Sequence, residues 1–122
     1  MKRDMELVIK ILKYLEDRRD VSMIKQIKIP GYDNLVVTYH IHRIYEAGLL
    51  DAETENSKST INRLIHVYPF GLTWEGHEFL DSMRNKQIMA QVKHRLGNTL
   101  SDIPFTLLKE LALSVGRTQL GL

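Results

Sequence analysis

The sequence predicts an α+β fold of 122 residues that is mostly helical. Three observations support this prediction. Apolar residues recur at helical spacing over most of the chain. One helical stretch, residues 34–47, ends at Gly48, because glycine adopts the left-handed turn after a helix at almost no conformational cost. Apolar and acidic side chains then alternate, which is typical of a strand with one buried face.

The first predicted helix covers residues 3–19. Its apolar residues occupy a broad arc, so we expect this helix to lie centrally and to contact more than one neighbour. The segment that follows, DVSMIKQIKIPGY, contains Pro30 and Gly31, which do not continue a helix. We therefore predict a short strand at residues 25–29 that could pair with the later hairpin.

The helix at residues 34–47 has Asp33 as its expected N-cap. One face of this helix is apolar and is predicted to be buried. The residues of that face are Val37, Ile41 and Ile44. His40 lies at the edge of the apolar face, where we expect its ring to satisfy a backbone group at the border of the core.

A β-hairpin is predicted next, with strands at residues 50–55 and 60–68 around the polar turn NSKS. The second strand should place Ile61 and Arg63 on a shared face, and Pro69 should end the pairing. A short helix, an Ala-Gly-Leu exit and an immediate hairpin form the signature of a winged helix-turn-helix. Here the first helix of that motif is degenerate, because the predicted strand takes its place.

Two resemblances accompany this pattern. The sequence HIHRIYEAGLL at residues 40–50 resembles the second motif helix of arsenic-repressor-type and related bacterial regulators. The opening MKRDM, the YHI and EAGL elements at 39–41 and 46–49, and LTWEGHEFL at 72–80 resemble an uncharacterised family of small bacterial and phage proteins, a domain of unknown function. This second resemblance covers most of the chain and implies no activity.

Three more helices are predicted after the hairpin. Thr73 is the expected N-cap of the first, and Gly76 within it should let a neighbour approach closely. The second covers residues 85–96. The third is capped by residues 101–102 and ends at Gly116.

The chain is predicted to be one domain, with a winged-helix core at residues 3–84, a C-terminal helical extension at 85–116 and a loose tail at 117–122. The last helix is apolar over more than one stripe. One stripe should pack on residues 5–15. The other is available for a two-fold partner, so we expect a homodimer through residues 105–115.

Composition and spacing argue against several classes of function. No apolar run approaches the ~20 residues of a membrane span, and there is no signal-peptide pattern, so a cytoplasmic bacterial or phage protein is expected. The absence of cysteine excludes disulfides and thiolate chemistry. His40 and His42 face different directions on a helix and cannot share a metal, and no catalytic triad spacing or nucleotide-binding loop is present. We expect no enzyme, no metal and no cofactor.

The exposed face of helix 34–47 is the candidate binding surface. A net charge of +2 and a pI of about 8.9 neither exclude DNA nor argue for it. The first hypothesis is a transcription regulator that reads double-stranded DNA with this helix, from which Arg43 should reach outward. The alternative is a contact with a host protein, because Glu46 and the acidic first strand oppose DNA. Under both hypotheses the predicted binding residues are Thr38, Tyr39, His42, Arg43, Lys58 and Arg63.

Overall fold

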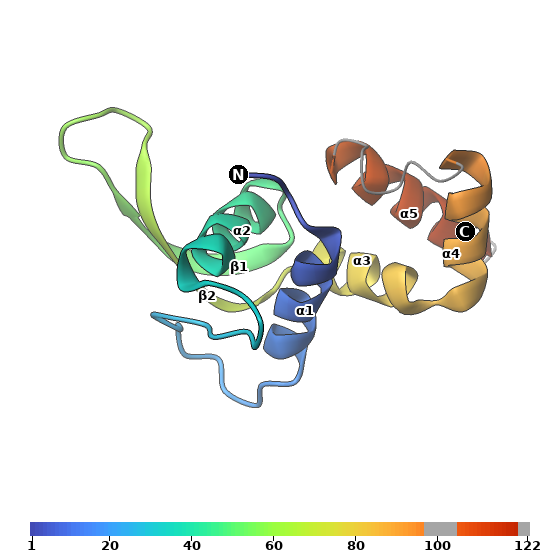
Figure 1. Cartoon of the computed structure of the whole chain (residues 1–122), viewed down its shortest axis with the longest axis horizontal. Coiled ribbons are helices and arrows are strands. Elements are labelled where there is room, and N and C mark those ends of the chain that lie inside the picture. The colour runs from blue at the N-terminus through green and yellow to red at the C-terminus, as the bar shows by residue number, and fades with distance from the viewer. Residues whose placement is uncertain (97–104, 120–122) are drawn as a thin grey trace.

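The computed structural model of the chain describes residues 1–96 and 105–119, and this part is α+β and mostly helical, as predicted (Figure 1). Its elements are α1 (Met5–Glu16), α2 (Asn34–Glu46), β1 (Leu50–Asn56), β2 (Leu64–Leu72), α3 (Trp74–Arg84), α4 (Lys86–Leu96) and α5 (Phe105–Gln119). The hairpin turn between β1 and β2 projects from one end of the molecule, and α4 and α5 lie at the opposite end (Figure 1).

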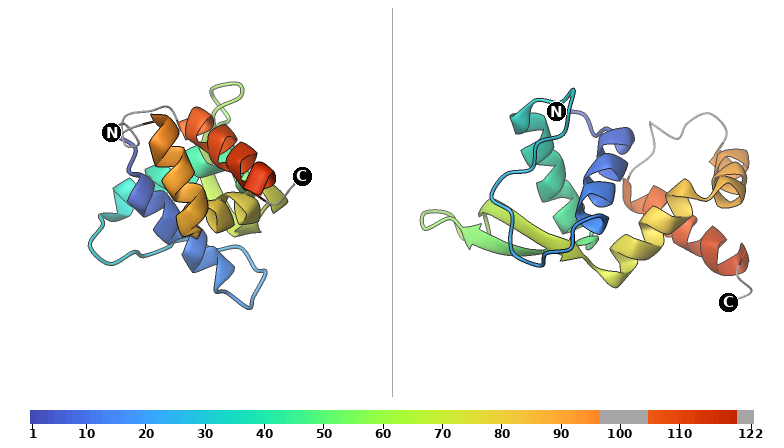
Figure 2. Two further views of the ribbon diagram at one scale, coloured as in Figure 1. Left: turned by 90° about the vertical axis from the view of Figure 1, so that its right-hand side faces the viewer. Right: turned by 90° about the horizontal axis from the view of Figure 1, so that it is seen from below.

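Helix α1 lies at the centre of the fold, as its broad apolar arc predicts. It packs on α2, α3 and β2, and Figure 2 shows it between α2 and α3. The Asp4 carboxylate accepts hydrogen bonds from the backbone N–H groups of Glu6 and Leu7 at 3.0 and 3.3 Å, which fixes the start of the helix. Its buried side chains are Leu7, Val8, Ile11, Leu12 and Leu15.

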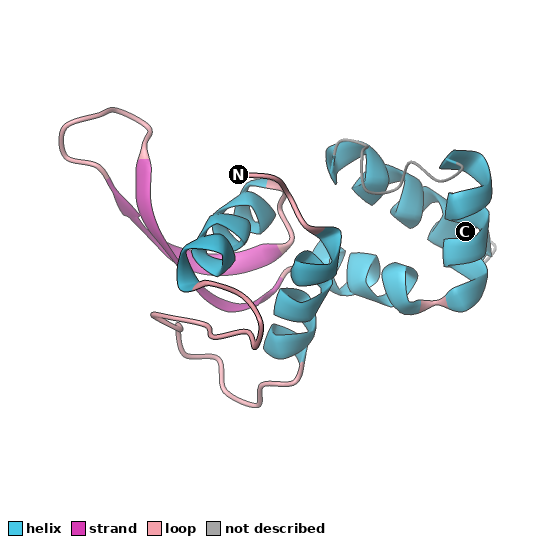
Figure 3. Cartoon of the chain, in the orientation of Figure 1, coloured by secondary structure: helices cyan, strands magenta, loops and turns pink. Residues whose placement is uncertain are grey.

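The segment between α1 and α2, residues 17–33, forms neither a helix nor a strand (Figure 3). The absence of a regular helix at residues 22–30 agrees with the sequence, but the strand predicted at residues 25–29 is wrong. The Ile24 N–H donates to the carbonyl of Pro69 in β2 at 2.8 Å. Strand pairing does not extend from this bond, because proline has no backbone N–H with which to donate a second hydrogen bond to the segment. Burial of Ile27 and Ile29 holds the segment instead.

Strands β1 and β2 pair in antiparallel fashion from Leu50 opposite Leu72 to Asn56 opposite Leu64. Two predictions for this hairpin are wrong. Pro69 does not end the pairing, because a register shift between Asp51 and Ala52 places the proline opposite Ala52 and the pairing continues.

The hairpin turn is the second difference, since it covers residues 57–63 rather than four residues. The Ser57 N–H donates to the Arg63 carbonyl at 2.7 Å, and the Ser57 hydroxyl accepts from the Thr60 N–H at 3.1 Å. Asn62 adopts a left-handed φ of 62°, a conformation that asparagine tolerates better than most residues. Ile61 and Arg63 therefore lie in the turn and not in the second strand.

Two glycines allow close helix packing in the C-terminal part. Thr73 caps α3 as predicted, and a Cβ at Gly76 would collide with the backbone of Leu49. The prediction that the last helix ends at Gly116 is wrong, because this glycine lies inside α5. A Cβ at Gly116 would come within 2.9 Å of the Ser82 hydroxyl oxygen. Helix α5 packs on α3 and α4. The prediction that one apolar stripe of this helix packs chiefly on residues 5–15 of α1 is therefore wrong. The predicted cap at 101–102 lies outside the described residues.

No helix in residues 1–96 or 105–119 has the length and apolar character needed to cross a membrane.

Candidate functional site

An open groove lies between the exposed side of α2 and the β1–β2 hairpin turn. Its volume is about 730 Å³, and we call it the α2–hairpin groove. Three of the six predicted binding residues meet in it. These are His42 and Arg43 from α2 and Arg63 from the turn. Glu46 lines the same groove and gives it one negative charge.

The orientation of α2 depends on the buried His40, whose exposed fraction is 0%. The ring Nδ1 lies 2.8 Å from the Val36 carbonyl oxygen, and the ring Nε2 accepts a hydrogen bond from the Asp4 N–H at 2.8 Å. This pair of bonds places the ring proton on Nδ1 and joins α2 to the first residue before α1. The predicted role of His40, a core-edge histidine that satisfies a backbone group, is confirmed.

Burial of the apolar face determines which residues of α2 remain available. Val37, Ile41 and Ile44 are buried, as predicted. The opposite side of the helix therefore faces solvent, with His42 and Arg43 about half-buried at the groove.

Arg43 lies along α2 instead of reaching outward, which corrects the prediction. Its Nη2 lies 2.6 Å from the Glu46 carboxylate, and its guanidinium carbon lies 5.3 Å from the centre of the Tyr39 ring. The Nε of Arg43 is buried and has no hydrogen-bond partner among the described residues. The guanidinium is thus held by one carboxylate and one ring, with one donor left unsatisfied.

The other predicted residues take three different places. Tyr39 lies under the Arg43 guanidinium. Thr38 lines a separate cavity of about 310 Å³ together with Lys25 and His66. Lys58 is exposed in the hairpin turn and is not among the residues that line the groove.

Sequence reasoning missed several groove residues in the turn and at the start of β2. They are Thr60, Asn62, Leu64 and Ile65. The missed signal is the serine- and threonine-rich run at residues 57–60, because such side chains bind nearby backbone N–H groups and extend a turn.

The acidic side chains of β1 do not line this groove. Asp51, Glu53 and Glu55 are exposed on β1, as predicted, and none of them lines the groove. The Tyr68 hydroxyl donates to the Glu55 carboxylate at 3.3 Å, and its ring stacks on His66 with centroids 5.5 Å apart. Burial, together with the Glu55 charge, raises the pKa of Tyr68. The groove surface and the β1 surface therefore differ in charge.

The described residues contain no cluster of side chains suited to bind a metal ion. No group of three or more His, Asp, Glu or Cys side chains in residues 1–96 and 105–119 is arranged to hold a metal ion.

Comparison with known proteins places the chain in a family. A family model described as "Hypothetical protein (DUF2513)" matches residues 2–99. The chain belongs to this family. An uncharacterised protein of Haemophilus influenzae (strain ATCC 51907 / DSM 11121 / KW20 / Rd) is 30% identical over 117 residues, which cover 94% of this chain and 95% of the relative. No solved structure matches the chain.

The DUF2513 match agrees with the resemblance to an uncharacterised family that the sequence motifs indicate. The matched residues include the whole α2–hairpin groove and α1, whereas α5 follows the match.

Proposed function

We propose that this DUF2513 protein is a winged-helix protein that binds double-stranded DNA, has no enzymatic activity and acts as a transcription regulator. In this proposal α2 is the recognition helix and the β1–β2 hairpin is the wing. The α2–hairpin groove is the observation that carries the proposal. It combines basic and hydrogen-bonding side chains of one helix, His42 and Arg43, with Arg63 of a projecting turn.

The two parts of the groove suit two kinds of DNA contact. An α-helix fits the major groove, and α2 has one buried face, so its opposite face can approach base edges. Arg63 and Lys58 lie in the turn, where long cationic side chains can contact phosphates on the flanking backbone. Phosphate contacts position the protein, and the α2 side chains supply any preference for sequence.

Residues 17–33 replace the helix that crosses the DNA backbone in an ordinary helix-turn-helix. Lys25 and Lys28 are exposed in this segment, and Lys25 lines a cavity beside Thr38 of α2. A loop with exposed lysines can supply the phosphate contacts that the missing helix would make.

The ion pair between Arg43 and Glu46 must break before Arg43 can contact DNA, and the Glu46 carboxylate repels the phosphates. The Arg43–Glu46 pair is partly exposed, so breaking it costs at most about 1 kcal/mol. The unsatisfied Nε of Arg43 further lowers the cost of leaving, because a buried donor without a partner is unfavourable. Glu46→Gln removes the negative charge from the groove and should raise DNA affinity on the order of threefold.

A fluorescence anisotropy titration with a labelled random-sequence duplex tests the proposal. Arg63→Gln and Lys58→Gln should weaken binding to every duplex, since phosphate contacts are independent of sequence. Arg117→Gln is the matched control, because Arg117 is exposed on α5, which packs on α3 and α4. Equal binding by the Arg63→Gln and Arg117→Gln variants would refute the role of the hairpin.

A second candidate function, contact with a host protein, is favoured by exposed apolar side chains in the hairpin turn and at the start of β2. Ile61 is 89% exposed in the turn, and Ile65, which lines the groove, is 48% exposed. Large exposed apolar side chains favour protein contact, and tyrosine and arginine, such as Tyr39 and Arg43, are common anchors at such interfaces. Under this hypothesis Ile61→Ser and Tyr39→Ala abolish co-purification with the partner, and the wild-type protein does not bind duplex DNA.

A further inference from the structure

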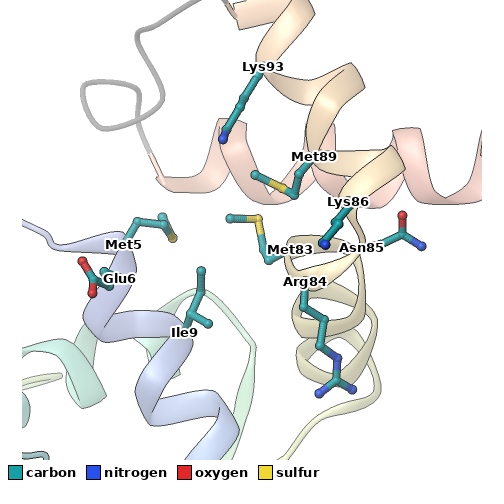
Figure 4. Close-up of a pocket in the computed structure, with 9 residues that line it drawn as sticks. All are labelled: Met5, Glu6, Ile9, Met83, Arg84, Asn85, Lys86, Met89 and Lys93. Carbon is teal, nitrogen blue, oxygen red and sulfur yellow. The ribbon is translucent and has the colours of Figure 1, made fainter.

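A second cavity, of about 350 Å³, lies between α1 and the corner formed by α3 and α4 (Figure 4). It is separate from the α2–hairpin groove, with which it shares no lining residue. Its apolar surface comes from all three helices. The side chains concerned are Met5 and Ile9 of α1, Met83 of α3 and Met89 of α4.

Methionine dominates this apolar surface. Three of the five methionines of the chain line the cavity. Methionine is unbranched and polarizable, so its side chain adapts to ligands of different shape. Figure 4 shows the thioether groups of Met5, Met83 and Met89 directed into the space between the helices. The cavity wall is therefore suited to a flexible alkyl group.

Two lysines add positive charge at the cavity. Lys86 and Lys93 are three residues before and four residues after Met89 on α4, which places all three on one side of the helix. Both lysines are exposed, and neither has an ion pair with another described residue. Lys86 also stands at the start of α4, where the helix macrodipole adds further positive potential.

The remaining charged residues at the cavity are already paired. Glu6 lies 3.4 Å from Lys10 of the same helix. The guanidinium of Arg84 donates to both carboxylate oxygens of Glu16 at 2.7 and 2.9 Å, and also contacts Asp81. The charges at the cavity that are available to bind a ligand are therefore those of Lys86 and Lys93.

We propose that this cavity binds a free medium-chain alkyl carboxylate. The alkyl chain lies against Met5, Met83 and Met89, and the carboxylate lies between Lys86 and Lys93. The volume is at the lower end of the range for small-molecule pockets, which is roughly 300–1,000 Å³. A partner helix would need a longer groove with several anchor positions, and a flat membrane surface would need apolar side chains that protrude instead of lining a hollow.

Titration of the full chain, labelled with ¹³C at the methionine methyl groups, tests the proposal by NMR. Decanoate below its micelle concentration should shift the signals of Met5, Met83 and Met89. The signals of Met1 and Met23, which lie outside the cavity, should not move. Decanoate has two more methylenes than octanoate, and each buried methylene contributes about fourfold in affinity, so decanoate should bind roughly fifteenfold more tightly.

Matched ligands and variants separate the charge from the apolar contact. Lys86→Gln and Lys93→Gln should each weaken decanoate binding about threefold to fivefold and leave decanol binding unchanged. Lys13→Gln is the control, because Lys13 is exposed on α1 and does not line the cavity. Equal affinity for decanoate, decanol and decyltrimethylammonium would overturn the proposal. So would equal shifts of all five methionines, or shifts with anionic phospholipid vesicles but none with monomeric decanoate.

Discussion

His40→Ala should destabilise the protein strongly, whereas His42→Ala, two residues along the same helix, should not. His40 is fully buried and holds the Asp4 N–H and the Val36 carbonyl at 2.8 Å each. Alanine removes both bonds and leaves a space the size of an imidazole ring. Leaving a buried polar group unsatisfied costs about 1–3 kcal/mol, and truncating a large buried side chain costs about 2–5 kcal/mol including the cavity.

The two terms overlap, because solvent entering the space can satisfy the Asp4 N–H. We therefore expect His40→Ala to lower the free energy of unfolding by roughly 3–4 kcal/mol. His42 is only half-buried at an open groove, so His42→Ala should change this free energy by less than about 0.5 kcal/mol.

Urea denaturation of both variants, followed by far-ultraviolet circular dichroism, measures the difference. His40→Ala should move the midpoint to lower urea without a change in the slope. A loss for His40→Ala no greater than the loss for His42→Ala would refute the structural role assigned to His40 and to its link between α1 and α2.

Three further predictions concern packing, pH and assembly. Gly116→Ala should cost up to about 1–2 kcal/mol in urea denaturation, because crowding of the buried Ser82 hydroxyl outweighs the roughly 0.5–1 kcal/mol that alanine gains over glycine inside a helix. Gly71→Ala meets no atom within 4 Å and should be nearly neutral. The hydrogen bond from Arg84 lowers the pKa of Glu16, so this pair stabilises the fold above the ordinary pKa of 4.5 and loses its effect as pH falls through the lowered value. The pair is partly exposed, so Arg84→Gln should remove less than about 1 kcal/mol at pH 7 and flatten the loss of stability in acid. Light scattering should give a dimer for the wild type and a monomer for Leu107→Glu, since Leu107 is half-exposed on α5, and a wild-type monomer at micromolar concentration would contradict the expected homodimer.

Local signals in the sequence were sufficient to place the described helices and to predict the N-caps of α2 and α3. Asp33 and Thr73 cap α2 and α3 because short polar side chains satisfy the first free N–H groups, a property that depends only on nearby residues. His40 could be placed for a similar reason, since its position on the helix face determines its burial. Glycine was ambiguous. Gly48 ends α2 with φ of 78°, but Gly116 allows α5 to pack near Ser82, and only the tertiary contact distinguishes the two uses.

Non-local pairing could not be predicted in the same way. The strand expected at residues 25–29 requires a partner, and the segment instead meets β2 at Pro69, which cannot donate. The hairpin turn is longer than predicted because the Ser57 side chain binds backbone N–H groups. The α2 residues of the candidate site could be predicted, because they follow from helical periodicity. The turn residues could not, because their positions depend on the hydrogen bonds of the Ser57 side chain. The pairing of Arg43 with Glu46 and Tyr39 was missed because three- and four-residue spacings permit such contacts without requiring them.

The salt dependence of duplex binding tests the central claim, that the α2–hairpin groove binds DNA, most directly. For the wild type, log K should fall linearly with log salt, with a slope of about −0.9 for each phosphate contact. Arg63→Gln should reduce that slope by about 0.9, and Arg117→Gln should leave it unchanged. Duplex binding that is absent at low salt, or a slope that is the same in the wild type and the Arg63→Gln variant, would contradict the proposed DNA-binding surface.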